Sequence, residues 1–513
     1  MPEPDTSDAH AVDQLLRERE RIRSELGGSE RVAALRGAAR PNVRERIDAL
    51  LDSGSFREVG TFARSANDAD ADATPGDGKI GGHGLIDGCP VTVVGDDITV
   101  KRGSSSPIGS RKLARIFEQA LAGGQPFVYL GETGGARIPD SLGSTSFSEL
   151  PPFPALIGRR RRIPMATAIV GESFGGSSFV AALSDFVVQV RGSCMAVTSP
   201  HVIEMATGEP ITMDDLGGVD VGARITGQID LSAETEAEAL QAVRTFLGYL
   251  PSAAGEPPPR HPATIPIEDD PEIAGVVPER RSRAYDMRRL LAHVLDDGEL
   301  FELKPLYGRG LVTGLGRLDG HPVGVIASQP KFEAGALTPA ACDKATRLVL
   351  LCDAFRLPLV MLQDTPGFMV GRAVEHERVL GKAMMFAQAL LGAGVPKLGV
   401  VLRKAFGLAF FSMGGPQMGM DFLAAWPGAE IGFMDPRVGA NVLAAGAAPE
   451  AVADLADRIA AGTDPMGPAG IMAIDDVIAP AETRRVLAEQ LARVTRADAR
   501  TKPGPLSNWP TCW

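Results

Sequence analysis

Two short glycine-containing turns hold the residues of this sequence whose types and spacing could do chemistry. Phe174-Gly175-Gly176-Ser177 lies between a predicted strand and a predicted helix, and Phe406-Gly407-Leu408-Ala409 takes the same place further along the chain. Free backbone N–H groups at such a turn can bind an anion, and glycine lets a substrate oxygen approach without a Cβ in the way. Two such turns suit a reaction with two oxyanions. The structural alternative is that these glycines only allow tight packing.

The side chains around the turns do not form a complete catalytic set. Glu132 and Asp364 each follow a buried strand and are expected to brace the turn rather than transfer protons. Ser173 and Ser177 flank the glycines, but no motif links them to a histidine, and GxSxG, GxxxxGK[ST] and HExxH do not occur. No two of the five cysteines are two to four residues apart, so no metal site is predicted. The base for the chemistry is therefore expected to come from a cofactor.

Composition narrows the class of protein. The 513 residues include 52 Lys and Arg against 64 Asp and Glu, a net charge of −12, with 44% hydrophobic residues. These values are typical of a globular protein of two or more domains. The acidic balance argues against general binding to nucleic acid or anionic membranes. With no signal-peptide pattern and no uninterrupted apolar run of spanning length, a cytoplasmic protein without a membrane span is expected.

The elements that must position the turns occur twice. With an offset of 232 residues, Ile86-Asp87-Gly88 matches Leu318-Asp319-Gly320, Phe127–Leu130 matches Leu359–Leu362, and Gly175 matches Gly407. Upstream the offset becomes 245, because Leu50, Asp52 and Phe56 match Leu295, Asp297 and Phe301. The difference equals the 13 residues Arg64 to Gly76, which are predicted to be an exposed insertion in the first copy.

Domain boundaries follow from the duplication. The predicted domains are residues 1–255 and 284–513, joined by a proline-rich linker at 256–283. In each copy an amphipathic helix (111–122 or 341–355) precedes a buried strand (127–130 or 359–362), and a second strand (166–170 or 399–402) leads into the glycine turn. This alternation predicts an α/β fold with parallel strands covered by helices. Helices at 12–26 and 482–497 are expected to serve packing or oligomerisation.

Several stretches in combination resemble the carboxyltransferase subunits of biotin-dependent acyl-CoA carboxylases, such as the propionyl-CoA carboxylase β subunit. They are RERIDALLDSGSF (44–56), GGARIPD (134–140), FGGSSFVAALSDF (174–186), DDLGG (214–218), LCDAFRLPLVMLQDTPGFMVG (351–371), RKAFG (403–407) and AAWPGAEIGFM (424–434). The resemblance covers nearly the whole chain, from about residue 13 to 500. It implies two tandem crotonase-like domains of ββα units. It also implies a homohexamer, a dimer of trimers, with each active site between the N-half of one subunit and the C-half of another.

The resemblance also implies roles for particular residues. Gly175 and Gly176 would stabilise the enolate of the acyl-CoA thioester, and the amides of Leu408 and Ala409 the ureido oxygen of biotin. Carboxybiotin would supply the CO₂ and the base. Leu408 stands where the family usually has glycine. Further expected contacts with the cofactor or coenzyme A are Gly134, Gly135, Ala136, Arg111, Lys112, Gly367, Phe368 and Gly407, and the expected substrate pocket is Phe174, Phe410 and Phe411.

Partners and alternatives follow from what the chain lacks. No biotinyl-lysine motif and no ATP-binding segment occur, so biotin is expected on a separate carrier, with a biotin carboxylase as a further subunit. One alternative is the carboxyltransferase subunit of a biotin-dependent decarboxylase. Another is a diverged, non-catalytic assembly subunit in which Leu408 and Phe411 close the biotin site. Phe411 stands where propionyl-CoA enzymes often have a smaller or acidic residue, so the acyl chain is left open.

Overall fold

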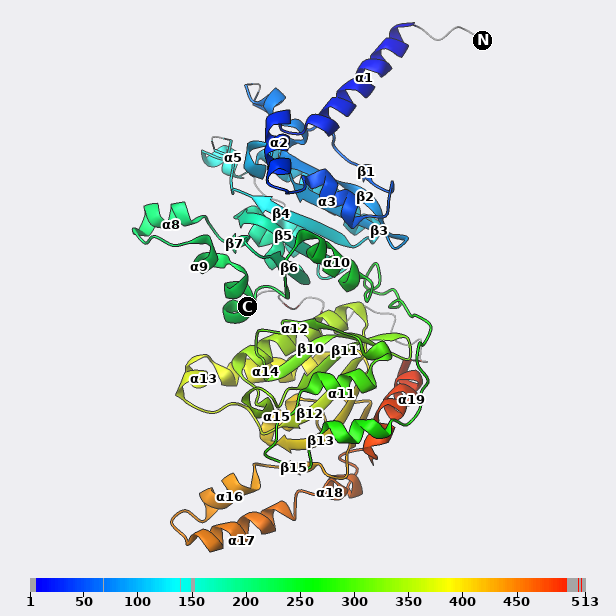
Figure 1. Ribbon diagram of the computed structural model, residues 1–513, viewed down its shortest axis with the longest axis vertical. Helices are drawn as coiled ribbons and strands as arrows, with labels where there is room; N and C mark the ends of the chain where they lie inside the picture. The colour runs from blue at the N-terminus through cyan, green and yellow to red at the C-terminus, as the bar shows by residue number, and fades with distance from the viewer. Residues whose placement is uncertain are drawn as a thin grey trace. The chain divides into compact units, whose positions relative to one another are not determined.

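The computed structural model describes residues 6–67, 69–138, 140–148, 153–495, 506 and 509. The chain forms two compact units, the first extending to Leu247 and the second beginning at Gly248 (Figure 1). The boundary therefore lies a few residues before the predicted end of the first domain. Among the described residues, no helix combines the length and apolar character needed to cross a membrane.

The first unit is built from short strands and helices in alternation. Its helices are α1 (Thr6–Glu25), α2 (Ser29–Gly37), α3 (Val43–Leu50), α4 (Pro107–Gly123), α5 (Ser144–Ser148), α6 (Phe153–Ile157), α7 (Gly176–Ala182), α8 (Pro200–Thr207), α9 (Met213–Gly217) and α10 (Glu236–Leu247). Its strands are β1 (Arg57–Glu58), β2 (Lys79–Ile86), β3 (Cys89–Asp96), β4 (Phe127–Thr133), β5 (Met165–Phe174), β6 (Phe186–Val190), β7 (Cys194–Ala196) and β8 (Leu231–Ala233).

The second unit repeats this series of elements. Its helices are α11 (Met287–Val294), α12 (Pro339–Phe355), α13 (Arg372–His376), α14 (Val379–Gly392), α15 (Gly407–Ser412), α16 (Pro436–Leu443), α17 (Pro449–Ala460), α18 (Met466–Gly470) and α19 (Thr483–Thr495). Its strands are β9 (Leu300–Leu303), β10 (Leu311–Leu318), β11 (His321–Ser328), β12 (Leu359–Thr365), β13 (Lys397–Phe406), β14 (Phe422–Ala425), β15 (Glu430–Gly432) and β16 (Asp476–Val477).

The two sheets have one topology. The first has the order β1-β2-β3-β4-β5-β6-β8 with β7 beside β5, and the second has β9-β10-β11-β12-β13-β14-β16 with β15 beside β13. In both, the first three strands pair antiparallel and the others parallel. The elements from β2 to β5 and from β10 to β13 have bounds that differ by 232 at α4 and α12 and at every main strand. The predicted duplication and α/β fold are therefore confirmed in this region.

Upstream of β2 the structure corrects the predicted alignment. Arg44 pairs with Glu58 in the first unit as Arg288 pairs with Glu302 in the second, an offset of 244 rather than 245. The carboxylate that accepts the two amides of the β2–β3 turn is Asp52 in the first unit and Asp296, not Asp297, in the second. The first copy is therefore longer by 12 residues, the difference between 244 and 232.

The inserted segment is only partly exposed. Thr74 is buried, its Oγ accepts the Ser65 amide at 2.9 Å and donates to the Asp70 carbonyl at 2.9 Å. Gly76 is also buried. The expectation of a fully exposed loop is therefore corrected: its C-terminal end is folded against the sheet.

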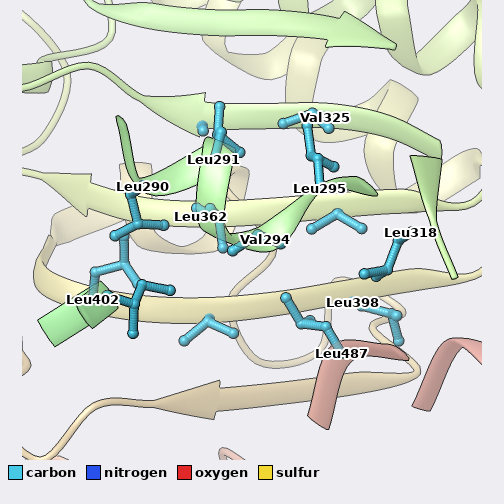
Figure 2. Close-up of a cluster of buried hydrophobic side chains, with 14 of the residues drawn as sticks. Leu290, Leu291, Val294, Leu295, Leu318, Val325, Leu362, Leu398, Leu402 and Leu487 are labelled. Atoms are coloured by element: carbon cyan, nitrogen blue, oxygen red, sulfur yellow. The ribbon is translucent and has the colours of Figure 1, made fainter. Parts of the chain in front are cut away.

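Helices cover both faces of the second sheet. On one face, α11 and α19 bury leucines and valines against alternate residues of β10 to β14, including Val325, Leu362 and Leu398 (Figure 2). On the other face, Phe410 of α15 packs with Val401 and Leu423. Because side chains alternate across a strand, β13 supplies apolar residues to both faces, and all ten of its residues are buried.

The predicted linker belongs to the second unit. Ile273 and Val276, in a short 3₁₀ segment at Pro271–Val276, are buried in the core of α11 and α19. The His261 amide donates to the Gly320 carbonyl at 3.0 Å. The linker expectation for residues 256–283 is thus corrected, since apolar anchors between the prolines attach this stretch to the second sheet.

Candidate active site

The first glycine turn joins β5 to α7. Gly175 has φ 63° and ψ −119°, a conformation that only glycine adopts readily. Its amide donates to the Val197 carbonyl at 3.1 Å, and its carbonyl accepts the Phe179 amide at 3.0 Å. A Cβ at Gly175 would meet no heavy atom within 4 Å. The outer side of this turn is therefore open, and the amides of the first helical turn, beginning with Gly176, have no acceptor within the helix.

The second glycine turn joins β13 to α15 in the same way. Gly407 has φ 62°, and a Cβ there would lie 3.3 Å from the Phe433 carbonyl oxygen. Leu408 is 50% exposed and does not have a positive φ, whereas Ala409 and Phe410 are buried. The leucine therefore keeps its amide in the helix start without backbone strain. Counted by position, Leu408 and Ala409 correspond to Gly176 and Ser177, one residue later than the predicted pair Gly175 and Gly176.

A pocket of about 620 Å³ lies within the first unit, next to the first turn. Of the predicted residues it brings together Gly134, Ala136 and Phe174. Its other lining residues are Lys101, Arg102, Ser104, Arg137, Ile138, Glu172, Ser199, Pro200, His201 and Met213. The size is that of a small-molecule site, and three of the lining side chains are basic.

The loop after each β4-type strand has a fixed shape. Gly135 has φ 105°, and its carbonyl accepts the Ser105 amide at 2.8 Å, so that Ser105 and Ala136 form a parallel bridge. In the second unit Leu337 and Phe368 form the equivalent bridge, with Gly367 at φ 134°. These hydrogen bonds hold both predicted loops, Gly134–Ala136 and Gly367–Phe368, against the segment that precedes the helix.

Lys112 does not fit its expected role. Its side chain is buried on α4, and its Nζ donates to the carbonyl oxygens of Lys79 at 2.6 Å and Gly76 at 3.3 Å. Burial lowers the pKa of Lys112 to about 8. An ammonium group enclosed in this way is not available to a phosphate, so this expectation is corrected to a role in the fold. Arg111, one residue earlier on α4, is exposed and remains a candidate.

Buried ion pairs lie beneath both turns, as expected for Glu132 and Asp364. The Glu132 carboxylate binds Arg40 and Arg46 from the segments before β1. The Asp364 carboxylate instead binds Arg403, which lies on β13 itself. Both carboxylates therefore brace their strand ends, with arginines drawn from different parts of the two copies.

Sequence reasoning missed the charged residues around the second turn. Arg281 forms ion pairs with Glu430 at 2.8 Å and Asp435 at 2.7 Å, and its Cζ lies 5.4 Å from the ring centre of Phe406. Burial raises the pKa of Glu430 and lowers that of Lys404. The signal available in the sequence was the placement of Arg281 in the segment interpreted as a linker.

The fold is shared with solved carboxyltransferases. A crystal structure of the transcarboxylase 12S hexamer, with methylmalonyl-coenzyme A and methylmalonic acid bound, matches with a TM-score of 0.90 and 33% identity over 97% of this chain and 99% of that one. A single-chain, multi-domain long-chain acyl-CoA carboxylase matches with a TM-score of 0.83 and 29% identity, over 94% of this chain and 48% of that one. The fold and the paired turns define a carboxyltransferase with two tandem crotonase-like domains.

Residues 36–506 match the carboxyl transferase domain family. The propionyl-CoA carboxylase carboxyltransferase subunit of Haloferax mediterranei is 34% identical over 96% of this chain and 97% of its own length. The methylmalonyl-CoA carboxyltransferase 12S subunit of Propionibacterium freudenreichii is 35% identical over 94% and 93%. The biotin-dependent long chain acyl-coenzyme A carboxylase β4 subunit of Mycobacterium tuberculosis is 38% identical over 78% and 76%. The chain belongs to the carboxyl transferase family.

Proposed function

We propose that this carboxyltransferase moves CO₂ from carboxybiotin to the α-carbon of an acyl-CoA. The observation that carries the proposal is the pair of equivalent turns, at Gly175 and Gly407, each between a buried parallel strand and a short helix. Each turn offers backbone donors whose positions are fixed by the strand before them. Such preorganised donors stabilise a developing oxyanion, and one donor is worth about 3–4 kcal/mol in a transition state.

The first turn is the proposed site of the acyl thioester. Its glycine is open on the outer side, and the neighbouring pocket of about 620 Å³ includes Lys101 and Arg102. A pocket of this size suits the arm of a coenzyme, and cations suit its phosphates. The amides of Gly176 and Ser177 would then hold the thioester oxygen as the enolate forms.

The second turn is the proposed site of the biotin ureido oxygen. Leu408 is half exposed while Ala409 is buried behind it, so the start of α15 faces outward and the helix is anchored. Carboxybiotin would supply the CO₂ and, once free of it, a basic nitrogen for the α-proton. The amides of Leu408 and Ala409 would orient the ring. Biotin would arrive on a carrier subunit.

Self-association is part of the proposal. Apolar side chains are exposed on α8 (Val202 at 50%, Met205 at 76%) and on α16 (Val442 at 64%, Leu443 at 73%). α16 and α17 project from the second unit (Figure 1). Exposed apolar patches of this kind mark interaction surfaces. We infer a hexamer like that named for the 12S relative, and expect Leu443→Glu to lower the mass measured by light scattering.

The test deletes single amide donors. Proline is tolerated in the first turn of a helix and removes only the N–H there. Gly176→Pro and Leu408→Pro, each compared with the alanine variant that keeps the N–H, are assayed in the complex with the co-purified biotin carrier. Each proline variant should carboxylate acetyl-, propionyl-, butyryl- and longer acyl-CoAs at about 10²–10³-fold lower kcat than its alanine control. Equal rates in the proline and alanine variants would remove the proposed oxyanion sites.

A further inference from the structure

A chain of buried hydroxyl groups runs beneath the first glycine turn. Ser173 Oγ, at the end of β5, donates to Ser177 Oγ on α7 at 2.8 Å. Ser177 in turn donates to the hydroxyl of Tyr129 on β4. The Tyr129 hydroxyl lies 2.9 Å from both carboxylate oxygens of Asp96 on β3, and Asp96 forms a buried ion pair with Lys79 on β2. Five side chains from five elements are thus joined in one line.

The direction of this chain is set by its charged end. Asp96 also accepts the Glu132 amide at 3.0 Å, so its carboxylate is surrounded by donors. Burial, and then the Asp96 charge, raise the pKa of Tyr129 far above its usual value, so its hydroxyl stays protonated and donates to Asp96. Ser177 both accepts and donates within the chain. Its hydroxyl is therefore committed to the brace, and what it can offer a substrate is its backbone amide.

The second copy has none of these side chains at the equivalent positions. An offset of 232 places Leu311, Ser328, Met361, Ala405 and Ala409 where the first copy has Lys79, Asp96, Tyr129, Ser173 and Ser177. There, Gln363 on β12 donates to the Met413 carbonyl, just after α15, at 2.7 Å. The first copy has Gly131 in place of Gln363, and a Cβ there would lie 2.7 Å from Ser177 Oγ. The two short helices are thus held at opposite ends.

We propose that Tyr129 is a positioning residue for the first turn: through Ser177 it fixes the start of α7, and so the amides that receive the acyl thioester oxygen. The role of those amides rests on the proposed function. The brace itself rests on the buried contacts. Its absence from the second copy means that the two turns respond separately to mutation, since only the first depends on Tyr129.

The test uses the full chain with its co-purified carrier. Tyr129→Phe keeps the buried ring and removes the hydroxyl, and Ser177→Ala installs the residue that the second copy has at this position. Thr167→Val is the matched control, because the Thr167 hydroxyl is also buried beside α7 but pairs with Ser184 at 2.7 Å, outside the chain. The readouts are carboxylation of acyl-CoA, decarboxylation of carboxybiotin without acyl-CoA, and deuterium uptake of residues 172–183.

We expect Tyr129→Phe and Ser177→Ala to lower kcat/KM for acyl-CoA about 10- to 100-fold, mainly through kcat, because small displacements of positioned groups cost this much. Decarboxylation without acyl-CoA should stay within twofold, and deuterium uptake should rise at the amides from Phe179 onward. Unchanged uptake in both variants, or an equal rise in Thr167→Val, overturns the positioning role. If the wild-type complex carboxylates no acyl-CoA, the proposed function fails, while deuterium uptake still decides whether Tyr129 braces the turn.

Discussion

Arg403 and Asp364 form a buried ion pair directly below the second glycine turn, with Nε 3.0 Å from Oδ2. Both side chains are almost inaccessible to solvent. Arg403 also donates to the backbone carbonyl of Arg283 at 3.1 Å, which ties the residues before α11 to the strand that ends at the turn. The pair thus connects the segment at 278–283 with β12 and β13.

Removing the cation should destabilise the protein more than its exposure-matched counterpart on the surface. Arg403→Met leaves a buried carboxylate with Lys404 as its remaining charged neighbour, and we expect a loss of about 3 kcal/mol in the free energy of unfolding. Arg224→Met, which breaks the exposed Arg224–Asp220 pair, should cost at most about 1 kcal/mol. Urea denaturation measures both. If Arg403→Met/Asp364→Asn is no more stable than Arg403→Met, unpaired charge is not the cause.

Backbone conformation at Gly175 gives a second prediction. Gly175→Ala forces a residue with a Cβ into φ 63°, ψ −119°, which should cost about 1–3 kcal/mol or move the turn. Gly192 also has a positive φ, 82°, and open space around its Cβ position, so Gly192→Ala is the control for strain alone. We expect both variants to lose stability in thermal unfolding, but only Gly175→Ala to lose carboxylation. Equal activity losses would argue against a special role for the first turn.

Much of the fold could be predicted from the sequence because the duplicated elements carry strong patterns. The apolar runs before each glycine turn marked β5 and β13, and both strands are indeed buried along nearly their whole length. The offset upstream of β2 was wrong by one residue. Leu50 and Leu51 are both leucines, and Asp296 and Asp297 are both aspartates, so identity alone could not distinguish the two alignments. Strand pairing and the Arg44–Glu58 ion pair resolve the ambiguity.

The glycine turns were visible in the sequence, but the residues beneath them were not. Lys79 and Asp96 lie at the ends of strands, where charged residues usually face water, and they pair only because the register of β2 and β3 places them opposite each other. Lys112 likewise had the pattern of an exposed helix residue, and its burial follows from the carbonyl groups of Gly76 and Lys79. Such contacts depend on tertiary neighbours that sequence periodicity does not specify.

The acyl-chain preference should depend on Phe411. Its ring is 40% exposed, tilted against Phe410 with 5.5 Å between ring centres, and lies two residues after Ala409. Phe411→Ala should favour longer acyl chains, raising the butyryl-to-propionyl ratio of kcat/KM about tenfold, the scale of one methylene group. Phe62→Ala, at a similarly exposed ring in the first unit, is the control. A ratio unchanged by Phe411→Ala would place the acyl chain elsewhere.

The buried Lys344 should make stability rise with pH. Its side chain is buried on α12 with Nζ 3.3 Å from the Lys304 carbonyl oxygen, and burial lowers its pKa to about 7. An unfolded lysine has a pKa of about 10.4, so between these values the unfolded state binds more protons and the folded state gains stability as pH rises. Below pH 7 both states are protonated and the cost of burying the charge is fully present.

Lys344→Met removes this titrating group while keeping a side chain of similar length. At pH 7.5 we expect the variant to be more stable than the wild type by on the order of 2–3 kcal/mol, after allowing for the lost hydrogen bond. The advantage should shrink to near zero by about pH 9.5, where a lysine is largely neutral in the folded state and its unfolded form is close to its own pKa. Buried thiols and tyrosines also titrate in this range, but they are common to both proteins and cancel in the difference. Lys331→Met, at an exposed lysine paired with Asp286, should show no such pH dependence. Denaturation at several pH values between 7.5 and 9.5 measures the difference, and an advantage of Lys344→Met that stays constant across that range would show that packing, rather than the buried charge, is responsible.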